Sequence, residues 1–353
     1  MTSGRVVAAA VMLLVWLAAC GQAIGPVGEP SAVETARESP TPDPTASPVV
    51  PVAAGSVTPS PLEARLEHRF AITGDPEDLV AGPNAMWLKR ANGMVDRIDP
   101  ATNEIVYSVE VMNTRGGGGH HCLGVGGGSV WACDENNVER LDPATGEVIA
   151  TVAVGKVFDQ VLIPVSSGHA WILSDAGATL LGVDLADNAV DVEVPLGTRC
   201  ADLAAHEDML WAACPLDDMV LRIDPATEQV TARIGGLERP RWLAAAEDVW
   251  VAFDHGLARV EAETAEVTGA VDVKAGGIHG GLFVTADTVW VRAREPFLRR
   301  VDPATMELVE EITTDSRAGG AVTVAFGSIW ASAPRRPGRL PDPAVGRHPP
   351  HRG

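Results

Sequence analysis

Short apolar stretches, most of them built around a tryptophan, recur along this chain between groups of turn-forming residues. Two examples are Ser129–Cys133 (SVWAC) and Val249–Phe253 (VWVAF), which are rich in the residues that strands favour. No stretch carries the apolar spacing of an amphipathic helix. The pattern therefore predicts an all-β protein made of short strands.

The tryptophans mark an internal repeat, and their successive spacings are 44, 40, 40, 39, 40 and 40 residues. The seven positions are Trp87, Trp131, Trp171, Trp211, Trp250, Trp290 and Trp330. A large aromatic residue at the same place in every repeat is expected in the core. The longest spacing contains a glycine-rich insertion, Arg115–His121 (RGGGGHH).

A second motif, Asp-Pro-Ala-Thr, follows four of these tryptophans at Asp99, Asp142, Asp224 and Asp302. Degenerate copies lie at Val183–Asn188 and Val260–Ala265. Asp accepts hydrogen bonds from free backbone N–H groups of a tight turn, and Pro presets its backbone angle. We therefore interpret this motif as repeated turn chemistry and not as a catalytic signature.

Each repeat contains four short strand patterns, which in the second repeat are Cys122–Gly126, Ser129–Cys133, Asn137–Leu141 and Glu147–Val154. Four antiparallel strands repeated seven times predict a seven-bladed β-propeller. We expect His68–Ile72 to complete the last blade as its fourth strand, which closes the ring without an open edge. Prolines 334, 337 and 341 make that blade the least regular.

The strand and turn sequences, of the form VWVA followed by RIDPAT, resemble the bacterial propeller family with YVTN-type and streptogramin (virginiamycin B) lyase-like repeats. The resemblance covers roughly Leu62–Val345 and implies the fold. For activity, the resemblance implies magnesium and a histidine acid/base at the loop face, with a Glu-x-His pair among the site residues. No Glu-x-His occurs in this chain, so no catalytic residue is carried over. His121, His255 and His279 are left as candidate general bases.

The N-terminus carries Arg5, an apolar run over Val6–Ala19, and then Cys20. The run is too short to span a bilayer and matches a secretory signal peptide. Its end, Leu17–Cys20 (LAAC), resembles the lipobox of bacterial lipoproteins, which implies lipidation at Cys20. An ordinary signal peptide is the alternative. Either reading places the mature protein outside the cytoplasm.

Composition divides the chain into a signal peptide at 1–19, a Pro/Ser/Thr-rich disordered tether at 20–61, the propeller at 62–345 and a disordered basic tail at 346–353. The net charge of −20 argues against a nucleic-acid partner, because phosphate binding needs a basic surface. It also disfavours binding to an anionic membrane surface, so membrane contact is expected through the lipid anchor alone.

Four further cysteines form two pairs that face each other across predicted hairpins, Cys122 with Cys133 and Cys200 with Cys214. Outside the cytoplasm such pairs are expected to oxidise to disulfides. Zinc binding with His120 and His121 is the alternative, but no Cys-x-x-Cys spacing supports it. No metal site is assigned.

The loops that lead into the first strand of each blade, and those that join the second strand to the third, meet on one face of a propeller. In this chain they are polar and of mixed charge, and we take them as the candidate binding face: His120, His121, Asp134, Asp159, Arg199, Asp202, Asp218, Arg239, Arg241, Asp254, His255, His279 and Arg317.

The sequence therefore predicts a monomeric, lipid-anchored β-propeller that acts as a binding or scaffold module for a protein or envelope-associated ligand, without a cofactor. Two alternatives remain open. One is a magnesium-dependent C–O lyase of the virginiamycin B lyase type, and the other is a non-catalytic sensor or spacer domain.

Overall fold

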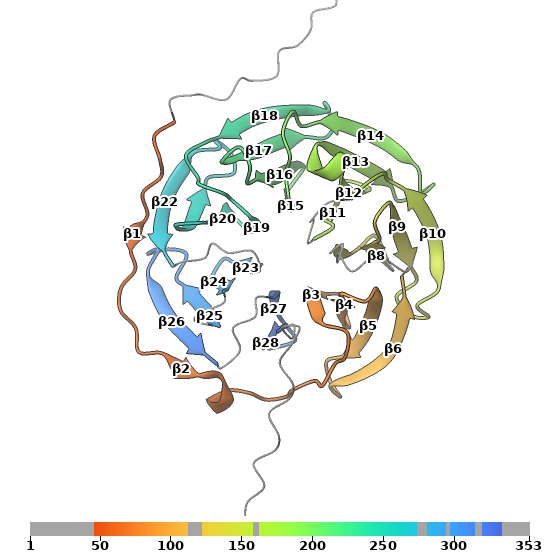
Figure 1. Ribbon diagram of the computed structural model, residues 1–353, viewed down its shortest axis with the longest axis horizontal. Coiled ribbons are helices and arrows are strands. Elements are labelled where there is room, and N and C mark those ends of the chain that lie inside the picture. The colour runs from red at the N-terminus through yellow and green to blue at the C-terminus, as the bar shows by residue number, and fades with distance from the viewer. Residues whose placement is uncertain are drawn as a thin grey trace, which may run out of the picture. The chain divides into compact units, whose positions relative to one another are not determined.

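The computed structural model describes residues 46–111, 122–157, 162–273, 281–293, 297–314 and 320–333. The described residues form short β-strands and two short 3₁₀ helices, η1 (Leu62–Ala64) and η2 (Asp175–Gly177). The strands form sheets that radiate around a central axis, and within each repeat the strands are antiparallel, with the first strand of the repeat nearest the axis (Figure 1). The predicted all-β propeller fold is confirmed.

Six sheets are complete four-stranded blades, numbered here in chain order. From the axis outward, blade 1 consists of β3 Pro76–Ala81, β4 Met86–Arg90, β5 Met94–Asp99 and β6 Glu104–Glu110. Blade 2 consists of β7 Leu123–Gly126, β8 Ser129–Cys133, β9 Asn137–Leu141 and β10 Val148–Ala153. Blade 3 consists of β11 Val165–Ser166, β12 His169–Ser174, β13 Thr179–Asp184 and β14 Val190–Pro195. Blade 4 consists of β15 Asp202–His206, β16 Met209–Cys214, β17 Met219–Asp224 and β18 Gln229–Ile234. Blade 5 consists of β19 Trp242–Ala245, β20 Val249–Phe253, β21 Gly256–Val260 and β22 Val267–Asp272. Blade 6 consists of β23 Gly281–Thr285, β24 Thr288–Arg292, β25 Leu298–Val301 and β26 Leu308–Thr313.

The prediction of seven four-stranded blades is wrong, because the structure has six. Among the described residues the seventh repeat contributes only a hairpin of β27 (Val322–Ala325) and β28 (Ser328–Ala331). The expected closing strand, His68–Ile72, is not a strand either. Phe70 from that segment packs instead against Trp330 of the hairpin, with ring centroids 6.0 Å apart. Among the described residues the hairpin has no third strand with which His68–Ile72 could pair. The segment therefore contributes apolar side chains rather than backbone hydrogen bonds.

The segment before the first blade, residues 46–64, lies along the outer edges of blades 5 and 6, and we call it the N-terminal belt (Figure 1). Its strand β1 (Val52–Ala53) pairs in parallel with β22, and β2 (Ser60–Pro61) pairs in parallel with β26. The sequence places the boundary between tether and propeller at residue 61. The belt pairs with the blades before that point, so the folded part begins earlier in the chain.

The predicted role of the tryptophans is confirmed for the six complete blades, where all are buried. Each packs with side chains of a neighbouring blade, as Trp171 does with Leu203 and Leu210. Trp330, in the two-stranded sheet, is half-buried. The core is therefore a series of apolar layers between adjacent blades rather than one central cluster.

The arginine that precedes the repeated turn has a structural role that the sequence alone did not reveal. Arg140 in blade 2 donates to the Leu185 carbonyl at 2.6 Å, in the turn of blade 3. Arg222 in blade 4 donates in the same way to the Glu263 carbonyl at 2.6 Å in blade 5, and Arg259 to the Pro303 carbonyl at 3.2 Å in blade 6. This arginine therefore links neighbouring blades at their turns.

Both predicted disulfides, Cys122–Cys133 and Cys200–Cys214, are present. The first joins the residue just before β7 to the last residue of β8, with Cα atoms 5.4 Å apart. Bonded sulfurs are not available as zinc ligands, so the alternative reading of these cysteines as a metal site is not supported.

Candidate functional site

The propeller has two faces, which differ in composition. The turn face carries the Asp-Pro-Ala-Thr turns, and the loop face carries the connections into each first strand and from each second strand to the third. On the turn face, Asp142 Oδ1 accepts the N–H groups of Ala144 and Thr145 at 2.8 and 2.9 Å. The N–H groups of Thr145 and then Ala144 hold the pKa of Asp142 below its ordinary value. The same turn at Asp302 has the same bonds, so the motif is structural as predicted.

Part of the predicted binding face lies outside the described residues: His120, His121, Asp159, His279 and Arg317, together with the proposed lipidation site Cys20. The other predicted residues divide into a buried pair, a cluster at the surface, and two arginines that join neither group. Arg199 is exposed, and Arg241 is half-buried.

Two predicted face residues, Asp134 and Asp202, are buried and are therefore not part of an accessible surface. Asp134 Oδ1 accepts the N–H groups of Asn136 and Asn137, both at 2.7 Å, so it holds a tight turn. Asp202, which is 2% exposed, accepts the N–H of Leu243 at 2.8 Å through Oδ2. Their loop positions predict a place on the binding face, and this prediction is wrong because each carboxylate turns inward to accept backbone N–H groups.

Asp202 directly precedes Leu203, which lines a cavity of ≈ 330 Å³ along the propeller axis. The cavity walls come from the first strands of blades 1 to 6 and are apolar. Burial raises the pKa of Asp202 to about 8, although the N–H groups of Leu243 and Leu203 oppose the shift. Among the described residues, Asp202 Oδ1 has no hydrogen-bond partner. A carboxyl group near the axis is therefore held largely protonated at neutral pH.

Lys89 is a second buried ionisable residue, and no feature of the sequence singles it out. Its Nζ donates to the backbone carbonyl of Cys133. Burial lowers the pKa of Lys89 to about 8, and the charge of Asp78, its neighbour across the β3–β4 pair, opposes the shift. Whether a blade contains such a buried ionisable group depends on which of its strand positions holds a polar residue.

Four predicted residues do come together on the loop face between blades 4 and 5. The backbone N–H of Arg239 donates to Asp218 Oδ1 at 2.8 Å, and the Arg239 guanidinium pairs with Asp254. His255 pairs with Glu238, with Nε2 and Oε2 2.6 Å apart. Glu238 was not predicted, although it adjoins Arg239 in the same loop.

A cavity of ≈ 530 Å³ lies beside this cluster, and we call it the loop-face pocket. Its lining consists of belt residues and acidic loop residues: Pro48, Val49, Val50, Pro51, Gly236, Glu238, Asp254, His255 and Asp272. The belt supplies the apolar wall, and its Val50 is 82% exposed. Three carboxylates and an imidazole supply the polar lining. The pocket is therefore acidic on one side and apolar on the other.

The belt reaches the pocket because Gly236 lets two backbones approach closely. Val49 donates its N–H to the Gly236 carbonyl at 2.8 Å. Gly236 has a φ of +83°, and a Cβ there would lie 2.5 Å from the Ser47 carbonyl oxygen. A residue with a side chain at position 236 would push the belt away from the pocket. No motif in the Pro/Ser-rich segment predicts this contact.

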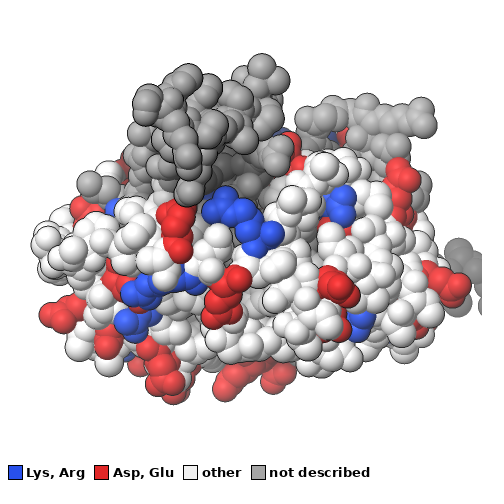
Figure 2. Space-filling model, turned by 90° about the horizontal axis from the view of Figure 1, so that it is seen from below, with Lys and Arg blue, Asp and Glu red and all other residues white. Residues whose placement is uncertain are grey.

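One group of described residues, His169, Asp184 and Asp191 in blade 3, has side-chain atoms close enough to ligate a metal ion. It lies at the turn-face end of the blade and shares no residue with the loop-face pocket. On the side of the molecule shown in Figure 2, acidic and basic side chains are interspersed, and acidic side chains follow the lower rim. Among the described residues, no helix is long and apolar enough to cross a membrane.

No protein-family model matches this chain, and no curated protein matches its sequence. Solved structures match in fold. The WD40 repeats of RRP9 give a TM-score of 0.65 at 12% identity, over 76% of this chain and 91% of that chain. U3-55K gives 0.64 at 12%, over 75% and 90%. The Pan2 WD40 domain of Neurospora crassa gives 0.61 at 11%, over 76% and 90%. At such identities the likeness is one of fold alone. The lipoprotein and streptogramin-lyase-like resemblances stay predictions.

Proposed function

We propose that this protein is a lipid-anchored binding module outside the cytoplasm, and that its loop-face pocket takes a cationic, partly apolar segment of a partner protein. The observation that carries the proposal is the pocket itself, in which Glu238, Asp254 and Asp272 face the apolar belt residues. A lysine or arginine flanked by an apolar side chain matches both walls. Catalysis is not part of the proposal.

The ion pairs at the pocket are of a kind that a ligand can replace. Glu238 and His255 are 55% and 59% exposed, and Arg239 is 59% exposed. In the Glu238–His255 contact both side chains are exposed, and contacts of this kind contribute about 0–1 kcal/mol, so exchanging it for a pair with the ligand costs little; Asp254 of the other pair is 18% exposed. The surplus of carboxylates over cations in the lining then favours a positively charged group.

The proposed location rests on two separate features. The LAAC sequence ending at Cys20 predicts processing as a lipoprotein. The two disulfides are consistent with an oxidising compartment. Expression of the full-length chain and a Cys20→Ser variant, followed by fractionation, tests the anchor. We expect the parent in the membrane fraction and the variant shed from it. Equal membrane association of both would contradict lipid anchoring.

Site-specific photo-crosslinking in the native envelope tests the binding face. A photoreactive residue at Val50 reports on the pocket wall, and one at Val148, 45% exposed on blade 2, serves as the matched control. We expect a discrete protein adduct from position 50, none from position 148, and loss of the first when Asp254→Lys is added. Identical adducts from both positions, or none from position 50, would show that the pocket does not bind a partner protein.

A further inference from the structure

Blade 3 departs from the repeat pattern at three positions, and the three altered residues meet at one point. In blades 1, 2, 4, 5 and 6 an arginine of the third strand pairs directly with the tryptophan of the second strand. In blade 3 the residue opposite Trp171 is Gly182. This blade therefore lacks the positive charge that the others carry beside their tryptophan.

The second departure is His169, two residues before Trp171. In other blades this position can hold a partner for the arginine, as Ser129 holds Arg140 at 2.8 Å and Asp248 pairs with Arg259 at 2.9 Å. With no arginine in blade 3, the imidazole of His169 lies beside the Trp171 ring, with ring centroids 5.0 Å apart.

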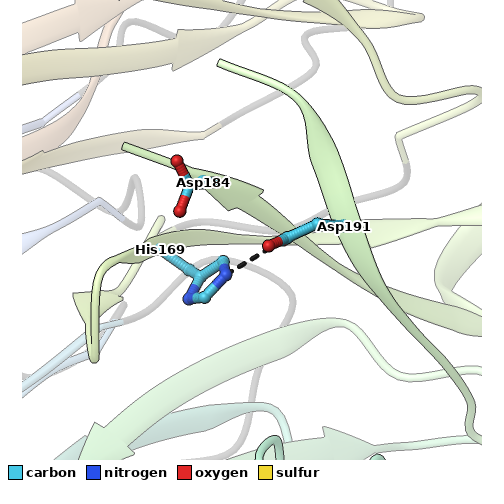
Figure 3. A group of neighbouring side chains, drawn as sticks. All are labelled: His169, Asp184 and Asp191. Atoms are coloured by element: carbon cyan, nitrogen blue, oxygen red, sulfur yellow. Dashed lines mark hydrogen bonds and ion pairs between the residues drawn. The ribbon is translucent and has the colours of Figure 1, made fainter. Parts of the chain in front are cut away.

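The third departure is Asp191, at the bulge of the outermost strand. The register between β13 and β14 shifts there, as it does in the other complete blades. The bulge residue is Ile149 in blade 2 and Thr231 in blade 4, but in blade 3 it is a carboxylate. Asp191 Oδ1 lies 3.0 Å from His169 Nε2 (Figure 3).

The turn residue Asp184 completes the group, in which one potential ligand atom of each residue lies within 4.8 Å of the others. Asp184 Oδ1 is occupied by the N–H groups of Ala186 and Asp187 at 2.7 and 3.1 Å. The group thus holds carboxylates from two strands and an imidazole from a third.

The imidazole of His169 is oriented by its other nitrogen. Nδ1 lies 2.9 Å from the carbonyl oxygen of Ser167, an acceptor, so the ring proton belongs on Nδ1. Nε2 is then the nitrogen that faces the carboxylate of Asp191, and a metal ion bound by both atoms would bridge them. A backbone carbonyl holding the far nitrogen is the usual support of a metal-binding histidine.

From this convergence we propose that His169, Asp184 and Asp191 bind a divalent transition-metal ion, with Zn²⁺ as the best match. Two ligands of a tetrahedral zinc, each ~2.0–2.1 Å from the metal, lie about 3.3 Å apart, close to the separation of His169 Nε2 and Asp191 Oδ1. The imidazole favours Zn²⁺ over Mg²⁺, which prefers oxygen ligands and keeps its waters. The metal takes the place of the arginine charge that blade 3 lacks. The sequence assigned no metal, and this inference departs from that expectation.

Equilibrium dialysis of the tag-free, chelator-stripped protein against Zn²⁺ tests the site, with bound metal counted by atomic emission. His169→Gln and Asp191→Asn each remove one ligand and keep a polar side chain. His206→Gln is the matched control, because His206 lies in the corresponding hairpin of blade 4 and contacts only the Glu247 carbonyl among the described residues. Circular dichroism confirms that every variant is folded.

We expect the parent and His206→Gln to bind one more zinc per chain than His169→Gln and Asp191→Asn do. For the two ligand variants we expect at least roughly 100-fold weaker binding at this site, since even altering groups that support a ligand costs 10–100-fold. Excess Mg²⁺ should not displace the zinc. Equal zinc content in the parent and His169→Gln would overturn the proposal, as would displacement by Mg²⁺.

Discussion

The turn face and the loop face of this propeller are built by different kinds of residue. On the turn face the same bonds recur, with an aspartate oxygen closing each Asp-Pro-Ala-Thr turn and an arginine of one blade bonded to the turn of the next. On the loop face the blades differ, and the Arg239–Asp254 pair and the belt contact at Gly236 each occur at one place among the described residues.

The difference separates residues that hold the repeats together from residues that give this chain its own chemistry. A bond that recurs in several blades cannot distinguish one of them from another, so its contribution is to stability. A group found in one blade adds nothing to the repeat, and it is often costly, as a buried carboxyl is. The substitutions below test this division, in order of decreasing expected effect.

Removing the Cys200–Cys214 disulfide should have the largest effect on stability and would show that the loop face also needs support. The two cysteines are 14 residues apart, and a loop of that length contributes about 3 kcal/mol to the free energy of unfolding. We expect the double Cys→Ser variant to lose about that amount in urea unfolding. A change below about 1 kcal/mol would mean that hydrogen bonds alone hold this part of the loop face.

The turn-face arginines should come next. Arg222→Ala removes bonds to the Ala262 and Glu263 carbonyls and should lower the free energy of unfolding by about 1–2 kcal/mol. The matched control is Arg199→Ala on the loop face, which should change stability by less than about 0.5 kcal/mol. If both variants lose the same amount, the repeated arginine is not a special link between blades.

Asp202→Asn should change how stability depends on pH. The folded pKa of Asp202, about 8, lies above that of the unfolded chain, so the folded state keeps a proton that the unfolded state releases. Its contribution is complete below the unfolded pKa and is lost as pH rises from about 4 to about 8. We expect the parent to lose stability over this window relative to the asparagine variant, as measured by urea unfolding at several pH values. Parallel profiles would mean that Asp202 is ionised in the folded protein.

Charge reversal at the loop-face pocket should have the smallest effect on folding. Glu238→Lys with Asp254→Lys breaks the exposed Glu238–His255 contact and the partly exposed Arg239–Asp254 pair, and should change the free energy of unfolding by about 1 kcal/mol. The same variant should lose the protein adduct formed from position 50. A matched reversal on the turn face, Glu147→Lys, should leave the adduct intact. Loss of the adduct in both would indicate a general charge effect and not a specific pocket.

Much of the fold could be predicted from the sequence, because the spacing of tryptophans and turns repeats and each copy supports the others. Both disulfide pairs followed from the same register. The closing strand at His68–Ile72 was predicted wrongly because an apolar stretch can supply side chains without supplying a backbone edge. The belt could not be predicted, since its pairing with β22 and β26 depends on strand edges rather than on any pattern of its own.

The candidate site was harder to predict. Asp218, Arg239, Asp254 and His255 were found because they lie in adjoining loops. Asp134 and Asp202 were assigned to the face on the same loop argument, which does not show whether a side chain turns outward or inward. The His169 group was missed, although a signal was present. Aligning the repeats shows Gly182 where five other blades carry arginine, and the neighbouring departures at His169 and Asp191 mark the same place.

Under the proposed N-terminal lipid anchor, the N-terminal belt has a mechanical consequence. Tension applied to the chain upstream of residue 46 would load the belt from its N-terminal end. The Val49–Gly236 hydrogen bond would carry that load before the bonds to β22 and β26. Bonds loaded in succession yield one after another at low force. The wall of the loop-face pocket would therefore peel away while every blade stayed intact, which makes the pocket the most force-sensitive part of the propeller.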